Sequence, residues 1–155
     1  MRKVIIIGGG AAGYFTAINA KEQNPDLDIT ILEKGKDVLQ KVKISGGGRC
    51  NVTNTIWKPE ELVTHYPRGH QYLLKPFQEF SSRDTQRWFE DCGVALKTEV
   101  DGRVFPITDD SQTIANALMR KTSALGVEIK YGHRATSFEQ KESGWLVNTN
   151  QGDFD

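Results

Sequence analysis

Short apolar runs alternate with a helical pattern in the first 33 residues of the chain. The run Lys3–Ile7 is rich in β-branched residues and ends at a glycine, which is typical of a buried parallel strand. Ala11–Gln23 follows a helical repeat, and Asp28–Leu32 is a second β-branched run. We expect the buried side of the helix to be formed by its apolar residues Ala11, Ala12, Phe15, Ile18 and Ala20. The pattern therefore predicts a strand–helix–strand unit.

The rest of the chain predicts further helices, a third strand and two hairpins. Helical segments are expected at Glu60–His65, at Gln71–Phe80, from a capping box at Ser81–Asp84 to Gly93, and from Asp110 or Ser111 to about Leu125. Hairpins are expected at Val94–Val100 with Arg103–Ile107, around the turn Asp101-Gly102, and at Ala135–Gln140 with Trp145–Asn150. The third strand, Val127–Tyr131, follows a long crossover, so we expect it beside the second strand in a 3-2-1 order. The fold class is therefore α/β, a Rossmann-like parallel sheet with an added antiparallel hairpin or meander.

Composition narrows the classes of partner. The 155 residues fit one domain, and 20 basic residues balance 20 acidic ones, so neither a nucleic acid nor a membrane surface is favoured as a partner. No apolar run approaches the length of a membrane span. The two cysteines, Cys50 and Cys92, form no CxxC pair, which suits a cytoplasmic protein, and the three histidines show no metal-ligand spacing.

A glycine-rich turn, Gly8-Gly9-Gly10-Ala11-Ala12-Gly13, lies between the first strand and the helix. In a G-x-G-x-x-G turn the first glycine allows a sharp bend, the second lets a pyrophosphate approach the backbone, and the third lets the helix pack closely on the strand. Glu33 ends the second strand twenty residues after Gly13, where a carboxylate accepts hydrogen bonds from a ribose 2′-hydroxyl and repels a 2′-phosphate. A connecting turn without a ligand is the simpler interpretation, but the combination favours FAD or NAD over NADP.

A second glycine cluster, Gly46–Gly48, lies among polar and basic residues. A flexible surface loop is the usual explanation of a glycine triplet. Here Lys41, Arg49 and Asn51 flank it, and glycine backbone N–H groups next to cations favour contact with a phosphate-bearing cofactor.

The segment Lys41–Asn54, with Ser45-Gly46-Gly47-Gly48-Arg49-Cys50-Asn51 at its centre, resembles the signature of a known family. This is a bacterial family of FAD-binding oxidoreductases, the NAD(FAD)-utilizing dehydrogenases or aminoacetone oxidase-type flavoproteins. Asp101–Pro106 and Gly126–Ile129 are similar to further motifs of the same family.

The resemblance implies a glutathione-reductase-like fold with two dinucleotide-binding domains, of which residues 1–155 are the N-terminal FAD-binding domain. The substrate domain and a C-terminal flavin-contacting segment of such proteins lie outside these residues. It implies that the cofactor is bound by Gly8, Gly10, Ala11, Ala12, Gly13, Glu33, Lys34, Lys41, Gly46, Gly47, Gly48, Arg49, Cys50, Asn51 and the backbone of Ala135.

These observations predict the FAD-binding portion of a flavin-dependent oxidoreductase that transfers a hydride to or from a small molecule. NAD(P)H is a candidate electron donor, and the alternatives are an NAD-binding dehydrogenase domain or a non-catalytic nucleotide-binding module. No catalytic acid, base or metal ligand is assigned. Arg103 is left between two roles, facing the active site or pairing with an acid such as Glu99. An incomplete sheet also predicts self-association.

Overall fold

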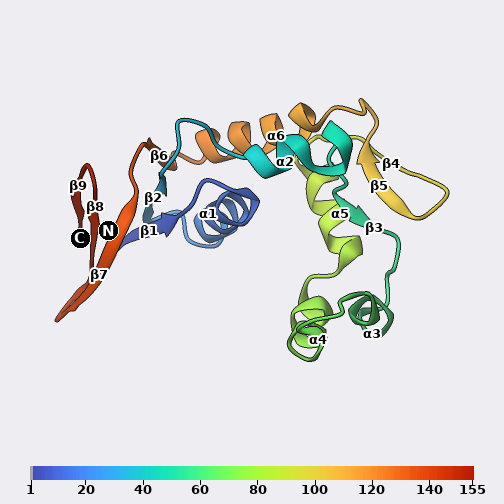
Figure 1. The fold of residues 1–155 in the computed structure, drawn as a ribbon, viewed down its shortest axis with the longest axis horizontal. Coiled ribbons are helices and arrows are strands. Elements are labelled where there is room, and N and C mark those ends of the chain that lie inside the picture. The colour runs from blue at the N-terminus through green and yellow to red at the C-terminus, as the bar shows by residue number, and fades with distance from the viewer. Residues whose placement is uncertain (1) are drawn as a thin grey trace. The chain divides into compact units, whose positions relative to one another are not determined.

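The computed structural model describes residues 2–155, which divide into two compact units (Figure 1). The first unit contains the chain up to Val42 together with Leu118–Asp155, and the second contains Lys43–Ala117. Two helices, α2 (Gln40–Ile44) and α6 (Ser111–Ala124), run across the junctions along the chain. Each unit is described by itself below, and the single domain predicted for residues 1–155 stays a prediction.

A three-stranded parallel sheet is the centre of the first unit. Its order is β1 (Arg2–Ile7), β2 (Leu27–Glu33) and β6 (Glu128–Tyr131), which confirms the predicted 3-2-1 arrangement. The middle strand β2 is the most buried, because Ile29, Ile31 and Leu32 are at most 1% exposed. Consecutive buried residues are expected of a parallel strand that is covered on both faces. The sheet ends in register at its carboxyl edge, where Glu33 lies beside Tyr131.

The helix α1 (Ala11–Gln23) has the predicted bounds but buries only part of the side that was expected, including Ile18. Its buried residues include Tyr14, Ala17 and Ile18, which recur at the three- and four-residue spacing of one helical face. Ala11 and Ala12 are exposed, so the prediction that they belong to the buried side was wrong. The fully buried Tyr14 was not among the residues expected on that side.

An antiparallel meander completes the first unit. Its strands are β7 (Ala135–Lys141), β8 (Gly144–Thr149) and β9 (Gly152–Phe154), paired in that order. The predicted second hairpin is confirmed. An ion pair of 2.7 Å between Lys121 and Glu22 also links α6 to α1 within this unit.

The second unit contains a small antiparallel sheet and short helices. The sheet order is β3 (Thr53–Asn54), β5 (Arg103–Pro106) and β4 (Leu96–Thr98), with Val104 and Phe105 fully buried. The hairpin at Asp101-Gly102 is confirmed, with shorter strands than expected, and β3 was not predicted because two residues show no periodicity. The helices are α3 (Pro59–Leu62), α4 (His70–Glu79) and α5 (Ser82–Asp91), with 3-10 turns η1 (Ser45–Gly48) and η2 (Val63–His65).

The capping box at the start of α5 is confirmed. The Ser81 N–H donates to an Asp84 carboxylate oxygen at 2.8 Å, and the Ser81 hydroxyl donates to the same oxygen at 2.6 Å. These contacts keep the pKa of Asp84 below its ordinary value, chiefly through the Ser81 hydroxyl. Within residues 2–155, every helix is too short or too polar to cross a membrane.

Candidate nucleotide-binding site

The glycine turn brings α1 very close to β1. A Cβ on residue 13 would lie 2.1 Å from the carbonyl oxygen of Gly8, so only glycine fits there. Gly8 has a φ of 103°, and its N–H donates to the carbonyl of Leu32 at 2.8 Å. Gly13 thus allows the close packing of helix on strand that the third glycine of a G-x-G-x-x-G turn provides. The hydrogen bond of Gly8 also connects the turn to β2.

Gly10 differs from Gly13, because no protein atom lies within 4 Å of the position that its Cβ would take. It stands at the N-cap of α1 and supplies no side chain to the first-turn N–H groups, and no acid lies in that turn. A helix start of this kind presents unpaired donors and the positive end of the helix dipole, which together suit a phosphate group. The space in front of Gly10 therefore fits the role that the sequence predicted.

Glu33 faces the same turn. One of its carboxylate oxygens accepts a hydrogen bond from the N–H of Gly9 at 2.8 Å, and the other accepts one from Gly35 at 2.7 Å. A carboxylate has about four acceptor sites, so each oxygen keeps capacity for a hydroxyl donor. The two backbone contacts fix the orientation of the side chain that was predicted to accept from the ribose.

A hollow of about 380 Å³ opens beside this turn. It is lined by Gly9, Gly10, Ala11, Ala12, Glu33, Asp37, Leu39, Gln40, Lys41 and Val42. Lys41 is the one cation among these described residues, and Glu33 and Asp37 are the two acids. The first turn of α1, where Ala11 and Ala12 are exposed, thus forms one wall of the hollow.

Most of the predicted residues of the first unit gather here, and some residues were missed. Four predicted residues lie outside the set of described residues that line the hollow: Gly8, Gly13, Lys34 and Ala135. Their predicted roles in binding stay predictions. The missed residues include Leu39, which has a left-handed φ of 56° and donates its N–H to the Gly9 carbonyl at 2.8 Å. No sequence pattern predicts a leucine with left-handed backbone geometry. Gly9 also lines the hollow and was missed, although its place in the glycine run could have indicated it.

The second glycine cluster lies in the second unit and is left-handed throughout. Gly46, Gly47 and Gly48 have φ values of 56°, 70° and 85°. A Cβ on residue 46 would lie 2.6 Å from the backbone nitrogen of Asn51, whereas the corresponding positions of Gly47 and Gly48 face open space. The cluster is thus a tight turn in which two of the three positions have room for a side chain, and its contact with a cofactor stays a prediction.

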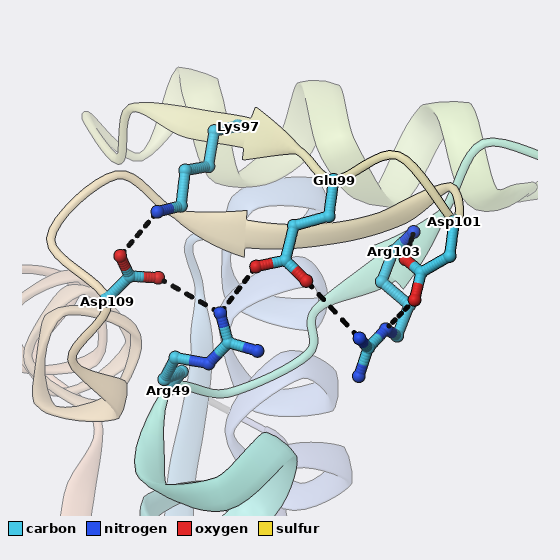
Figure 2. A network of polar contacts seen from close by, with 6 residues as sticks. All are labelled: Arg49, Lys97, Glu99, Asp101, Arg103 and Asp109. Carbon is cyan, nitrogen blue, oxygen red and sulfur yellow. Dashed lines mark hydrogen bonds and ion pairs between the residues drawn. The ribbon is translucent and has the colours of Figure 1, made fainter.

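Arg49, directly after this turn, is at the centre of an ionic network (Figure 2). Its guanidinium donates to Glu99 at 2.5 Å and to Asp109 at 3.4 Å, and it lies 4.0 Å over the ring of Phe105. Lys97 pairs with the other oxygen of Asp109. The hydrogen bond to Glu99 raises the pKa of Arg49 above its ordinary value. The carboxylates of this unit therefore already neutralise the cation that was predicted to face a phosphate.

Arg103 joins the same network. It contacts Asp101 at 2.8 Å and the second oxygen of Glu99 at 3.3 Å (Figure 2). Of the two roles left open by the sequence, the structure shows pairing with acids. The backbone N–H of Arg103 also donates to Asp101, at 3.2 Å. This hydrogen bond, followed by the contact with the guanidinium, lowers the pKa of Asp101 below its ordinary value.

Cys50 and Asn51 follow this turn, the first buried and the second exposed. Cys50 is buried with a φ of 61°, and burial raises the pKa of its thiol, partly offset by Ser45. The Asn51 amide, oriented to satisfy its hydrogen bonds, donates to the carbonyls of Thr53 at 2.8 Å and Val104 at 3.3 Å. The Asn51 side chain therefore contacts β3 and β5, whereas Cys50 contacts Ser45 of the turn. Among residues 2–155, no group of three His, Cys, Asp or Glu side chains is placed to hold a metal ion.

Comparison with known proteins agrees with this geometry. The 3-dehydro-bile acid delta(4,6)-reductase of Clostridium scindens is 25% identical over 147 residues, which are 95% of this chain and 35% of that protein. The ribosomal RNA dihydrouridine synthase of Escherichia coli is 27% identical over 146 residues, which are 94% of this chain and 35% of that protein. The chain thus spans about a third of the length of these relatives.

Solved structures show the same fold. The 3-ketosteroid-delta4-(5alpha)-dehydrogenase of Rhodococcus jostii RHA1 matches with a TM-score of 0.69 at 14% identity, over 98% of this chain and 43% of that one. A flavocytochrome c3 fumarate reductase in its open conformation matches with a TM-score of 0.69 at 16% identity, over 99% of this chain and 31% of that one.

These likenesses confirm the Rossmann-like fold and the resemblance found in residues 41–54. The model of the HI0933-like protein Rossmann domain matches residues 2–154. Since this match covers nearly the whole of the sequence, the chain belongs to the HI0933-like protein family, of which it contains the Rossmann domain.

Proposed function

We propose that this chain binds FAD and forms the FAD-binding portion of a flavin-dependent oxidoreductase. One observation carries the proposal: the open space in front of Gly10, at the uncapped start of α1, lies in the same hollow as the Glu33 carboxylate. A diphosphate and a ribose are joined at the distance of a few bonds in ADP, so one ligand meets both features. The residues therefore fit the ADP half of FAD.

In this proposal, different residues of the hollow bind the diphosphate and the ribose. The first-turn N–H groups of α1 donate to the diphosphate, and Lys41 on the rim adds a positive charge. Glu33 accepts from the ribose hydroxyls while it remains fixed by Gly9 and Gly35. Its charge disfavours a 2′-phosphate, so NADP is the least suitable dinucleotide.

The flavin half of the proposal rests on the likeness of residues 41–54 to the family signature. The contacts of Gly46–Gly48, Arg49, Cys50 and Asn51 with the ribityl chain and flavin ring, and of Lys34 and Ala135 with other parts of the cofactor, are implied by that likeness alone. Bound FAD supplies two-electron, hydride-type transfer, and the protein supplies binding and orientation. NAD(P)H is the proposed electron donor.

The relatives support redox chemistry without fixing the substrate. The two relatives described above are named a reductase and a synthase of dihydrouridine. One relative is named for a bile acid and another for ribosomal RNA. Because the charges of this chain balance, we propose a small molecule as its substrate. We propose a cytoplasmic location because Cys50 and Cys92 form no CxxC pair.

Calorimetric titration of the cofactor-free protein with FAD, NAD and NADP tests the proposal. We expect FAD to bind most tightly, the purified full-length protein to be yellow, and its flavin to be reduced by a hydride donor. Tight NAD binding with no FAD binding would establish the alternative of an NAD-dependent dehydrogenase domain. Binding of ADP compounds by a colourless full-length protein with no redox activity would establish a non-catalytic nucleotide-binding module.

The open side of β1 supports self-association as a further part of the proposal. Among the described residues β1 pairs with β2 alone, and Ile7 is 47% exposed. A hollow of about 680 Å³ beside it is lined in part by Ile5, Ile7, Phe138 and Trp145. We propose that a second copy covers this apolar surface. Sedimentation of the 155-residue chain should show dimers that Ile7→Lys dissociates, and a monomer at all concentrations would contradict this part.

A further inference from the structure

Tyr14 carries a buried hydroxyl without a close hydrogen bond next to the proposed adenosine site. The side chain is fully buried in α1, directly after Gly13. Its hydroxyl lies beyond ordinary hydrogen-bond distance of every described polar atom, and the Tyr131 hydroxyl is near enough to act on its pKa. A buried polar atom without a partner destabilises the folded state, so such an atom in a native protein calls for an explanation. Phenylalanine would fill the same space without this cost.

The surroundings of Tyr14 are those of the proposed ribose contact. Burial first, then the charge and the nearby hydroxyl of Tyr131, and last the charge of Glu33, raise the pKa of Tyr14 above its ordinary value. Tyr131 lies beside Glu33 in the register of β6 and β2, so both side chains leave the sheet on the same side at its carboxyl edge. Backbone bonds continue past them, since His133 donates to the Glu33 carbonyl at 2.9 Å and Gly132 donates to Gly35 at 3.0 Å.

Tyr131 differs from Tyr14 in being 47% exposed. A tyrosine in this situation combines an apolar ring with a hydroxyl that still reaches solvent or a ligand. It stands next to the carboxylate that, in the proposed function, binds the ribose. The pair therefore consists of one accessible hydroxyl at the site and one buried hydroxyl beneath it.

We propose that the Tyr131 hydroxyl contacts the adenosine part of the bound nucleotide, and that Tyr14 is a positioning residue whose hydroxyl holds Tyr131 in the bound state. This inference rests on the proposed function. A ligand that orders Tyr131 brings its hydroxyl to hydrogen-bond distance of the Tyr14 hydroxyl. Since the full hydrogen bond forms only on binding, the hydroxyl of Tyr14 favours the bound state over the free state.

The test compares Tyr14→Phe, Tyr131→Phe and the double variant in cofactor-free full-length protein, with ADP as the probe in calorimetric titration. Tyr72→Phe, at a tyrosine that is 75% exposed in α4, is the matched control. We expect each single variant to weaken ADP binding by about fivefold, as loss of one hydrogen bond does, and the control to leave it unchanged. The double variant should lose little more than either single one, because the two hydroxyls act together.

Thermal unfolding of the same proteins without ligand separates positioning from a structural role. Removing an unpaired buried hydroxyl should leave the melting temperature of Tyr14→Phe unchanged or higher, although its ADP affinity falls. ADP affinity of Tyr14→Phe within twofold of the wild type overturns the inference, and so do losses that multiply in the double variant. Failure of the wild type to bind ADP or FAD would instead reject the proposed function and the inference with it.

Discussion

The two glycine-rich turns of this chain look alike in sequence but solve different structural problems. In Gly8–Gly13, one glycine allows close packing of a helix on a strand, and another leaves space in front of an uncapped helix. In Gly46–Gly48, all three residues have left-handed φ values and form a tight turn. A glycine run therefore indicates a backbone requirement, and the neighbouring elements decide whether that requirement is packing, ligand access or chain reversal.

The charged residues next to the two turns differ in the same way. Glu33 is held by backbone N–H groups and keeps acceptor capacity beside a hollow. Arg49 is already paired with two carboxylates and lies over an aromatic ring. The carboxylate at the first turn can thus still accept hydrogen bonds from a ligand. The guanidinium at the second turn instead binds carboxylates of its own unit. The difference can be tested one residue at a time.

The largest effect is expected for Gly13→Ala. Alanine normally stabilises a helix relative to glycine, by about 1 kcal/mol. Here its Cβ would lie 2.1 Å from the Gly8 carbonyl oxygen, so we expect the free energy of unfolding to fall by about 3 kcal/mol or more. Urea unfolding measures the loss.

Gly10→Ala is the matched control for that substitution. Its Cβ meets no protein atom within 4 Å, so the free energy of unfolding should change little. ADP affinity should nevertheless fall, because the methyl group takes space that the diphosphate needs. Equal loss of stability in both variants would show that the two glycines do not differ as described.

The next effect concerns Gly46→Ala in the second turn. Its left-handed φ and the 2.6 Å approach to the Asn51 nitrogen should together lower the free energy of unfolding by about 2–3 kcal/mol. Gly47→Ala has a similar φ but open space, and should cost about 1 kcal/mol. Equal costs from chemical denaturation would mean that strain in φ alone determines the requirement for glycine.

The sequence predicted the first unit well because its signals are local. Apolar runs, the glycine spacing and the position of Glu33 fix strand, turn, helix and strand order without long-range information. The buried side of α1 was predicted wrongly, because burial depends on which face meets the sheet, and a tyrosine was not ranked as a core residue. The left-handed Leu39 carries no pattern at all.

The site in the second unit was less accessible to sequence reasoning. The partners of Arg49 lie 50 and 60 residues away along the chain, in Glu99 and Asp109. Nothing in residues 45–51 shows that these acids return to that position. Only the fold of the hairpin and the following turn brings them there, so the interpretation of Arg49 as an available cation missed its internal pairing.

A smaller effect than those on the folded structure is expected from Glu33→Ala. Loss of the ribose contact should weaken ADP binding by about 1.5–3 kcal/mol, roughly 10- to 100-fold. Gly9 and Gly35 also lose their acceptor, so some loss of stability should accompany it. Asp101→Ala, which removes a carboxylate paired with Arg103, is the control and should leave ADP affinity unchanged. Calorimetry that finds equal ADP affinity in wild type and Glu33→Ala would remove Glu33 from the site.

The smallest effect is the acid sensitivity of the Arg49 network. The contact with Lys97, followed by that with Arg49, lowers the pKa of Asp109 below its ordinary value. A carboxyl group with a lowered pKa in the folded state stabilises that state above its unfolded pKa, near pH 4, and this contribution is lost as the pH falls through the lowered value. Asp109→Asn should therefore reduce the difference in stability between pH 5 and pH 2, and Asp91→Asn, at an exposed acid of the same unit, should not.

Because Asp109 is 42% exposed, the effect should be small and should shrink further in high salt. Acid unfolding curves that are identical for Asp109→Asn and wild type would show that the network shapes the turn without contributing to its stability.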